Sequence, residues 1–419
     1  MKFLVTGVGG QLGHDVMNEL IKRGHEGIGS DIAPEYSGVK DNSAVTAAPY
    51  ISLDITDNFS VNKVITSVNP DVVIHCAAWT AVDAAEDEEN KNKAHSINAD
   101  GTRNIAAACK KTDSKMIYIS TDYVFDGQGS TPWQPDCKDY KPLNVYGETK
   151  LAGELAVSST IQKYFIIRIA WVFGLNGKNF IKTMLNVGKK HDEVRVVNDQ
   201  IGTPTYTLDL SRLLIDMAET DKYGYYHATN EGGYISWYDF TCEIYRQAGL
   251  KTKVTPVTTA EYGLSKAARP FNSRLDKSKL VKNGFTPLPA WQDALNRYLH
   301  EIGELADKEK QLAHYDALIK KNIDKEYNVF SATQSNNVDT EINTLNQIIE
   351  SKKKQIDDIN KKKQEIINKL EDIKHLNYKN VLGKEPVENI HDKLILIRKF
   401  MDIDLHRAKM EMDKLLKLF

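Results

Sequence analysis

The segment VTGVGGQLG, at residues 5–13, restricts the fold of this chain more than any other feature. An apolar run comes directly before it, and an amphipathic stretch begins near Gln11. Gly7, Gly10 and Gly13 lie three residues apart, and glycine allows both a tight turn and a close approach of the backbone to a pyrophosphate. The segment therefore predicts a strand, a turn and a helix that bind a dinucleotide.

Apolar runs and amphipathic stretches alternate along the first 300 or so residues. The apolar runs are KFLVTG, DVVIHCAA, MIYIST and YFIIRIAWVFG, and the amphipathic stretches are residues 11–23, 87–111, 146–158 and 178–189. Apolar strands that alternate with helices indicate a parallel sheet covered on both faces. This part is therefore predicted to be α/β, with a Rossmann-like doubly wound parallel sheet. A small substrate-binding lobe is also expected, and that expectation rests on the family resemblance given below.

Three segments at the ends of predicted strands are expected to face the cofactor, because ligands of parallel sheets lie beyond the carboxyl ends of the strands. Asp31 ends the second strand, where a carboxylate can accept hydrogen bonds from an adenosine ribose. LDIT at 53–56 and HCAAWT at 75–80 follow later strands, although the alanines in the second segment would also suit simple packing. An acidic strand end favours NADH, but the long insert at 33–50 leaves NADPH open.

A tyrosine and a lysine share one face of a predicted helix. Tyr146 and Lys150 are four residues apart, and the strand before them ends at Ser120 and Thr121. Reduction of a ketone needs a proton donor for the developing alkoxide. The pKa of a free tyrosine is about 10, and a nearby ammonium is expected to lower it. The pattern predicts a donor, its tuning cation and a hydroxyl that holds the carbonyl oxygen.

These motifs resemble the extended short-chain dehydrogenase/reductases, with TGxxGxxG at Gly7–Gly13 and YxxxK at Tyr146–Lys150. Residues 1–302 are more narrowly similar to the dTDP-4-dehydrorhamnose reductase family. The segments that carry this similarity are CAAWTAVDAAE, YISTDYVFDG, NVYGETKLAGE, RIAWVFG, NFIKTM, VVNDQIGTPTY and ARPFNSRLD.

The resemblance implies that the chain reduces dTDP-4-dehydro-β-L-rhamnose to dTDP-L-rhamnose with NADPH or NADH. It implies Thr121, Tyr146 and Lys150 as the catalytic set. The cofactor-binding residues that it implies are Gly7, Gly10, Gln11, Leu12, Gly13, Asp31, Asp54, Ile55, Ala77, Ala78, Trp79, Thr80, Tyr146 and Lys150. The substrate-binding residues that it implies are Val82, Thr121, Asp122, Tyr123, Trp171, Arg269, Asn272 and Arg274. No metal site is predicted.

The two arginines of ARPFNSRLD can be interpreted in two ways. Planar guanidinium donors suit a diphosphate or the carbonyls of a nucleotide base, which favours substrate binding by Arg269 and Arg274. Surface ion pairing would explain the same residues.

Two rival functions share the predicted fold. One is a non-catalytic regulatory subunit that binds NADP, as a subunit of methionine adenosyltransferase does. The other is a nucleotide-sugar epimerase, which keeps and regenerates its nicotinamide. Joint retention of Thr121, Tyr146 and Lys150 favours catalysis over the regulatory role.

The composition changes near residue 303. All but one of the 25 glycines lie at or before Gly303, and the chain beyond it is rich in lysine, asparagine, isoleucine and glutamate. Apolar residues recur there at intervals of three and four, which predicts an all-α coiled coil or helical bundle. We therefore expect a reductase at 1–302 and a helical extension at 303–419. The extension could serve as an oligomerisation or partner-binding module, or it could be a fused foreign segment.

Bulk properties exclude several classes of protein. A formal net charge of -2 gives no general attraction to nucleic acid or to a membrane surface. The four cysteines have no zinc-like or disulfide-framework spacing, and the N-terminus has no long apolar run. A cytoplasmic protein is expected, with a dTDP-sugar as its small-molecule partner and a homo-oligomer or protein contact through the extension.

Overall fold

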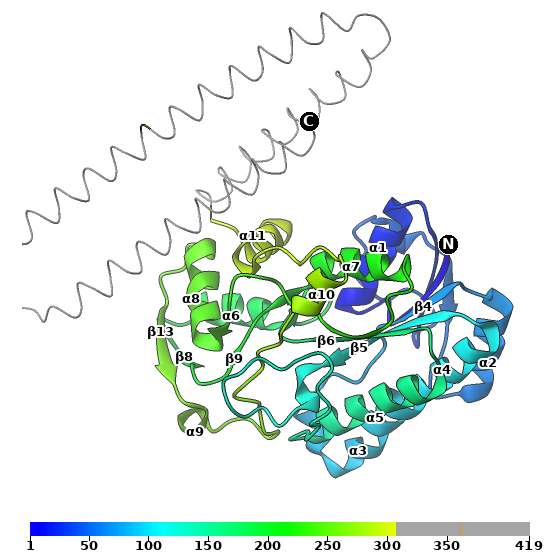
Figure 1. Ribbon diagram of the computed structural model, residues 1–419. Helices are drawn as coiled ribbons and strands as arrows, with labels where there is room; N and C mark the ends of the chain where they lie inside the picture. Colours follow the sequence, from blue (N-terminus) through cyan, green and yellow to red (C-terminus); the bar gives the residue numbers. More distant parts are fainter. Residues whose placement is uncertain (307–360, 362–419) are drawn as a thin grey trace, which may run out of the picture. The chain divides into compact units, whose positions relative to one another are not determined.

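A seven-stranded parallel sheet forms the centre of the protein in the computed structural model, which describes residues 1–306 and residue 361 (Figure 1). The strand order is β11-β6-β5-β4-β1-β2-β3. The strands are β1 (Lys2–Thr6), β2 (Glu26–Asp31), β3 (Tyr50–Ser52), β4 (Val72–His75), β5 (Lys115–Thr121), β6 (Tyr164–Ile169) and β11 (Gly224–His227). The predicted α/β fold is confirmed, and each of the four apolar runs contributes a strand.

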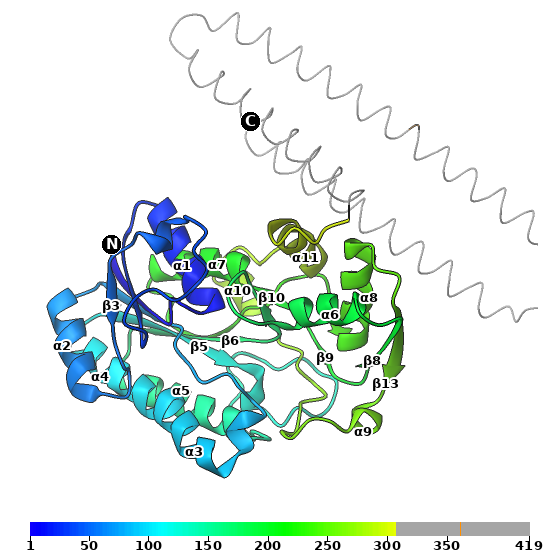
Figure 2. The same cartoon turned by 180° about the vertical axis from the view of Figure 1, so that it is seen from behind.

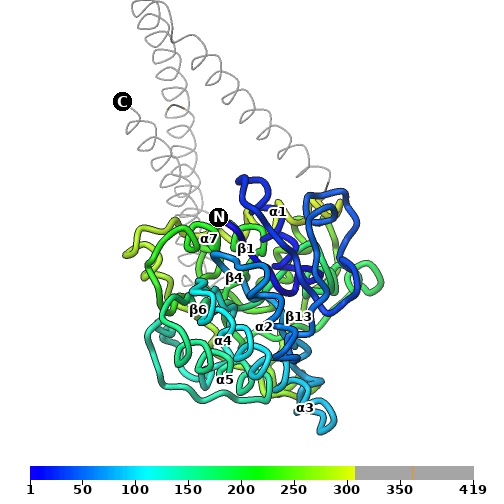
Figure 3. Tube along the Cα trace, turned by 90° about the vertical axis from the view of Figure 1, so that its right-hand side faces the viewer, coloured from blue at the N-terminus to red at the C-terminus, as the bar shows by residue number. Residues whose placement is uncertain are grey.

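Helices cover both faces of this sheet, as Figure 2 and the side view in Figure 3 show. On one face α1 (Gln11–Lys22) packs beside α7 (Thr207–Ala218). On the other face lie α2 (Asn58–Val68), α4 (Thr102–Thr112) and α5 (Val145–Thr160). Separate apolar cores fill the two layers, with Val16 and Leu210 in the first and Val61 and Ile105 in the second. Burial on both faces explains why the strands are continuously apolar.

The amphipathic stretch 87–111 is divided into three parts. They are α3 (Glu88–His95), a π-helical turn η3 (Ser96–Gly101) and α4. Asn98 in the π-helical turn holds the loop after β4, since its side chain bonds both the N–H and the carbonyl of Trp79 at 2.8 and 3.1 Å. A π-helical turn inside a helix often marks a functional site.

A small lobe packs beside the carboxyl ends of the sheet. Its paired strands are β7 (Val172–Phe173), β8 (Glu193–Val197), β9 (Ile201–Gly202), β10 (Thr205–Tyr206), β12 (Ile235–Ser236) and β13 (Lys253–Val257). Its helices are α6 (Phe180–Gly188), α8 (Trp237–Ala248), α9 (Thr259–Tyr262) and α11 (Trp291–Glu301), whereas α10 (Ser278–Lys282) packs against β11 of the large sheet. Four short helical turns complete the structure: η1 (Ala44–Thr46), η2 (Ala84–Glu86), the π-helical η3 and η4 (Asp122–Val124).

Residues 1–306 all belong to one compact unit of the chain. Apart from residue 361, the predicted helical extension beyond residue 306 lies outside the described residues. Within the described part of the chain, no helix has both the length and the apolar character that a membrane span requires.

Candidate active site

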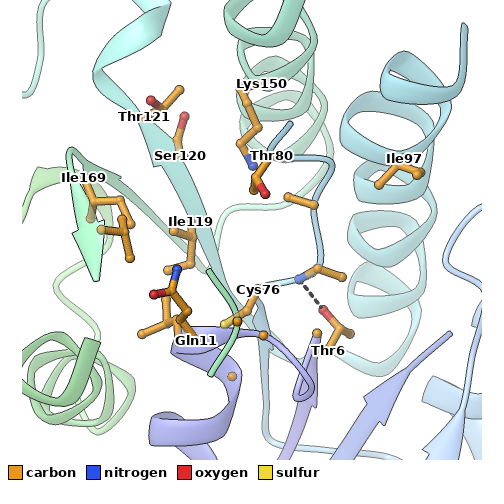
Figure 4. Close-up of a pocket in the computed structure, with 18 of the residues that line it drawn as sticks. Thr6, Gln11, Cys76, Thr80, Ile97, Ile119, Ser120, Thr121, Lys150 and Ile169 are labelled. Atoms are coloured by element: carbon orange, nitrogen blue, oxygen red, sulfur yellow. Dashed lines mark hydrogen bonds between the residues drawn. The ribbon is translucent and has the colours of Figure 1, made fainter. Parts of the chain in front are cut away.

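A cavity of about 650 Å³ lies beyond the carboxyl ends of the parallel strands (Figure 4). Residues at the ends of six neighbouring strands line it, from β2 and β3 at one side to β5 and β6 at the other. The strand order reverses between β1 and β4, so the cavity spans the switch point of the sheet. Doubly wound sheets bind their ligands at this point.

The glycine turn forms the floor of the cavity. Gly7 has φ +74°, and a side chain there would bring its Cβ within 2.6 Å of the Ala77 nitrogen. A Cβ on Gly13 would lie 2.2 Å from the Gly7 carbonyl oxygen. Helix α1 begins at Gln11 with no side-chain cap and no acidic residue in its first turn. Its free N–H groups and positive dipole end therefore fit the pyrophosphate of a dinucleotide.

Two carboxylates line the cavity, at the end of β2 and after β3. Asp31 accepts hydrogen bonds from the N–H groups of Gly9 and Ile32 at 2.9 and 2.8 Å. Asp54, after β3, also lines the cavity. The buried hydroxyl of Ser30 has no hydrogen-bond partner among the described residues. These acceptors and the unpaired hydroxyl suit the ribose hydroxyls of a bound adenosine.

Thr121, Tyr146 and Lys150 meet at the opposite end of the cavity. Thr121 ends β5, and the other two residues lie on the first turns of α5. Helix α5 begins where it does because the Asn144 side chain accepts a hydrogen bond from the Gly147 N–H at 2.8 Å. The N-cap therefore sets the rotation that turns Tyr146 and Lys150 toward β5.

The predicted lowering of the Tyr146 pKa is wrong. Burial raises the pKa of Tyr146 above its ordinary value, and a hydrogen bond with Thr121 offsets only part of this effect. Burial also lowers the pKa of Lys150 to about 7, so its positive charge is only partly developed at neutral pH. Tyr146 is accordingly a neutral phenol, the protonation state that a proton donor needs.

Asp122 is a second acid beside the Thr121 hydroxyl. Its side chain is 2% exposed, and the Thr121 hydroxyl donates to its Oδ1 at 3.0 Å. Its Oδ2 has no partner among the described residues. Burial raises the pKa of Asp122 to about 6. Asp122 lines the cavity, but Oδ2 itself is buried, so the contact shown for this carboxyl group is the one with the Thr121 hydroxyl.

Two stacked indoles form the wall on the side of the small lobe. The rings of Trp171 and Trp237 are 3.7 Å apart and nearly parallel. Trp171 has φ +52°, an unusual and strained value for a bulky residue, which suggests a functional constraint. A side chain on Gly202 would come within 2.9 Å of the Trp171 ring.

Most of the predicted site residues line this one cavity. They are Gly7, Gly10, Gln11, Leu12, Gly13, Asp31, Asp54, Ile55, Ala77, Ala78, Thr80, Val82, Thr121, Asp122, Tyr123, Tyr146, Lys150 and Trp171. The glycine turn, the hydroxyl at the end of β5 and the YxxxK pair are therefore brought together as expected.

The cavity lining does not include Trp79, Arg269, Asn272 or Arg274. The Trp79 indole donates to the Ala81 carbonyl at 3.1 Å. Arg269 pairs with Asp83 and donates to the Tyr123 hydroxyl, which agrees with the ion-pairing alternative.

Asn272 has a structural contact of its own, because its amide donates to the Gln128 and Thr131 carbonyls at 3.1 and 2.9 Å. Arg274 donates to the Asn272 side chain at 3.1 Å. The substrate roles of Arg269, Asn272 and Arg274 and the cofactor role of Trp79 remain predictions.

Several lining residues were not named individually as site residues, although Leu53 and Cys76 lie in segments expected to face the cofactor and Ser120 was expected at a strand end. The lining residues not named are Thr6, Ser30, Ile32, Leu53, Cys76, Ile97, Ile119, Ser120, Ile169, Ala170, Val172, Gly177, Lys178 and Trp237. Ser30 adjoins a predicted strand end, so the sheet-edge rule could have found it. Trp237 carried no local signal, because only the fold of the small lobe brings it to Trp171.

Comparison with known proteins identifies one family. The family described as RmlD substrate binding domain matches residues 1–304. A dTDP-4-dehydrorhamnose reductase from Aggregatibacter actinomycetemcomitans is 38% identical over 307 residues, which are 70% of this chain and 97% of that protein. The spore coat polysaccharide biosynthesis protein SpsK of Bacillus subtilis is 37% identical over 306 residues, which are 73% of this chain and 99% of that protein.

Solved structures agree with these relatives. A dTDP-4-dehydrorhamnose reductase from Clostridium acetobutylicum is 40% identical with a TM-score of 0.65, and the match covers 72% of this chain and all of that one. The Bacillus anthracis reductase in complex with NADP is 38% identical with a TM-score of 0.64 and the same coverage.

Proposed function

The chain belongs to the RmlD substrate-binding domain family, and from this premise we propose that it is an NAD(P)H-dependent oxidoreductase that reduces dTDP-4-dehydro-β-L-rhamnose to dTDP-L-rhamnose. One observation carries the proposal: Thr121, Tyr146 and Lys150 line the same cavity as the glycine turn. Dinucleotide and ketone can therefore meet in one cavity. This reaction would place the protein in the synthesis of dTDP-rhamnose.

The cofactor is held by the residues at the ends of β1 to β4. The N–H groups at the start of α1 bind the pyrophosphate, and Asp31 and Asp54 bind the adenosine end. Ala77, Ala78 and Thr80 flank the nicotinamide half. When bound, the reduced nicotinamide supplies the hydride to C4 of the sugar.

Tyr146 supplies the proton. As hydride reaches C4, negative charge develops on O4 and the neutral phenol donates its proton to that oxygen. The Thr121 hydroxyl holds the same oxygen, and the Lys150 ammonium stabilises the phenolate that Tyr146 becomes and hydrogen-bonds the ribose. A proton from solvent then restores Tyr146. Val82, Asp122, Tyr123 and Trp171 contact the sugar and nucleotide of the substrate.

Turnover with a purified ketosugar nucleotide tests the proposal. The full chain is mixed with dTDP-4-dehydrorhamnose and either NADPH or NADH, and oxidation of the cofactor is followed together with product identity. The proposal expects one cofactor oxidised for each dTDP-L-rhamnose formed. Sugar conversion without net cofactor oxidation would indicate an epimerase. Tight cofactor binding without turnover would indicate the regulatory role.

The same assay decides the cofactor. Asp31 and Asp54 place two carboxylates at the adenosine end, and the lysines that line the cavity are Lys150 and Lys178. A 2′-phosphate near the carboxylates would be repelled, which favours NADH. The related Bacillus anthracis structure contains NADP, so both reduced cofactors must be compared by kcat/KM.

A further inference from the structure

Lys150 is a buried lysine without a carboxylate partner. It is 3% exposed, and its ammonium makes no ion pair or side-chain hydrogen bond within residues 1–306. Its nitrogen instead lies over the ring of Tyr118, 4.2 Å from the centroid. An aromatic face attracts a cation through its quadrupole, and this attraction is strongest where water is excluded.

Tyr118 is fixed beneath Lys150 by contacts with α5. The Tyr118 hydroxyl donates to the Lys150 carbonyl at 3.2 Å, and Tyr118 is fully buried. One turn further along α5, a Cβ on Gly153 would lie 2.2 Å from the Tyr118 hydroxyl oxygen. Gly153 therefore provides the space that lets the phenol reach the helix.

An uncharged histidine also contacts the Tyr118 ring. The rings of Tyr118 and His75 are stacked, with centroids 5.9 Å apart. His75 is bonded to the hydroxyls of Thr6 and Thr102 at 2.7 and 3.1 Å, and burial lowers its pKa to about 3. His75 consequently adds no positive charge that would compete with Lys150 for the ring.

No carboxylate forms an ion pair with Lys150 among the described residues, although the charge of Glu154 partly offsets the burial that lowers the pKa of Lys150. Glu154, on the same helix as Lys150, directs both carboxylate oxygens to Arg168 at 2.8 and 2.7 Å. Cys76, after β4, and Tyr146, on α5, are the remaining titratable groups around Lys150. Burial keeps both protonated, because it raises their pKa values. The face of Tyr118 is thus the aromatic group that the ammonium contacts at close range.

We propose that Tyr118 is a positioning residue of the active site, whose ring face orients the Lys150 ammonium and keeps it charged. The inference rests on the proposed function, in which Lys150 stabilises the Tyr146 phenolate and binds the nicotinamide ribose. Tyr118 does not line the cavity, so it acts only through Lys150.

Two substitutions separate the ring face from the hydroxyl. Tyr118→Phe keeps the face and loses the hydrogen bond to the Lys150 carbonyl, whereas Tyr118→Leu loses both. If Tyr118→Leu does not fold, Tyr118→Met provides a more adaptable apolar replacement.

Tyr226 offers a matched control on β11 of the same sheet. It is also buried, its hydroxyl donates to the Lys222 carbonyl at 2.7 Å, and the Lys279 nitrogen lies 5.2 Å from its ring centroid. It does not line the cavity. Tyr226→Leu therefore removes a buried ring and its contact with a lysine, as Tyr118→Leu does, but at a position outside the proposed site.

The measurement is the pH dependence of NADP⁺ and NAD⁺ binding by the full chain, with the pH profile of kcat/KM beside it. Charged Lys150 is lost as pH rises through its pKa, and removal of the ring face lowers that pKa. Tyr118→Leu should move the alkaline midpoint down by about one pH unit. Tyr118→Phe and Tyr226→Leu should keep the wild-type midpoint.

Three outcomes would overturn the proposal: an unchanged midpoint in the leucine or methionine variant, an equal shift in Tyr118→Phe, or an equal shift in Tyr226→Leu. Binding needs no sugar substrate, so a wild-type chain that binds cofactor without reducing the sugar contradicts only the proposed function. A wild-type chain that binds neither nucleotide contradicts both proposals.

Discussion

The protonation of single residues decides what the cavity can do. Burial keeps Tyr146 protonated and lowers the pKa of Lys150 to about 7, so the site holds a neutral donor beside a partly charged lysine. Phenolate character develops only when the Tyr146 proton leaves. The Lys150 charge therefore stabilises the transition state more than the resting enzyme. An interaction that is stronger in the transition state lowers the barrier to reaction.

Replacement of the phenol tests this assignment most directly. Tyr146→Phe should lower kcat by roughly 100- to 10,000-fold, the usual contribution of a general acid. NADPH affinity should change little, because the ring stays in place. Stopped assays give kcat, and cofactor titration gives affinity.

Tyr245→Phe is the control for that substitution. Tyr245 is buried, bonds the Met184 carbonyl at 3.0 Å and does not line the cavity, so its variant should keep wild-type turnover. Near-normal activity of Tyr146→Phe would show that another group supplies the proton.

At the scale of elements, the insert between β2 and β3 is fastened to α1. His14 of α1 is buried between Asp15 at 3.0 Å and Asp41 of the insert at 3.4 Å. Asn18 accepts a hydrogen bond from the Val45 N–H at 2.8 Å. The insert thus packs on the helix whose N-terminus faces the proposed pyrophosphate site.

The attachment of the insert should weaken as pH rises. Burial lowers the pKa of His14, but the carboxylates of Asp15 and Asp41 outweigh it and raise the pKa above 6.5. The protonated His14 imidazole therefore stabilises the attachment fully below pH 6.5. This stabilisation is lost as the pH rises through the folded-state pKa of His14. Hydrogen exchange of residues 39–46, corrected for its intrinsic pH dependence, should become faster between pH 6 and pH 8.

His14→Gln keeps a polar side chain but cannot titrate, so its corrected exchange should not vary over that range. The same pH dependence in wild type and variant would exclude His14 as the titrating group. Asp41→Asn should reduce the pH dependence of the exchange, since it removes the carboxylate of the insert that pairs with His14.

Elements with a local signal could be predicted from the sequence, and elements that depend on tertiary packing could not. Gly7 and the Tyr146–Lys150 pair follow from a turn and a helical spacing that a few residues define. Trp237 reaches the cavity only through the packing of α8 against Trp171. The pKa of Tyr146 was misjudged because spacing shows which charges are near but not how deeply they are buried.

For the whole molecule, the contacts of residues 303–306 decide where the reductase unit ends. The predicted boundary at residue 302 leaves Leu305 outside, yet this side chain is 2% exposed within the apolar core of the small lobe. Glu304 pairs with Lys189 at 2.6 Å, and the Ala306 N–H donates to the Gln247 carbonyl at 2.9 Å. We therefore propose that the folding unit extends to residue 306.

Two truncated chains test this boundary. A chain of residues 1–306 should keep the unfolding free energy of its α/β unit and the proposed turnover. The unfolding free energy of a chain of residues 1–302 should be lower by roughly 2–5 kcal/mol, the cost of removing a buried leucine. Urea denaturation of both chains measures the difference, and Leu305→Ala in the full-length chain should reproduce most of it.

The same pair of chains tests whether the segment beyond residue 306 is a passive appendage. Light scattering would compare the mass of the full chain with that of 1–306 while kcat/KM is measured for both. Equal kcat/KM with a lower oligomeric state for the truncated chain would identify the segment as an assembly module. A folded 1–306 chain without turnover would show instead that catalysis depends on that segment, and the reductase unit would then have to be extended beyond the boundary that Leu305 and Ala306 indicate.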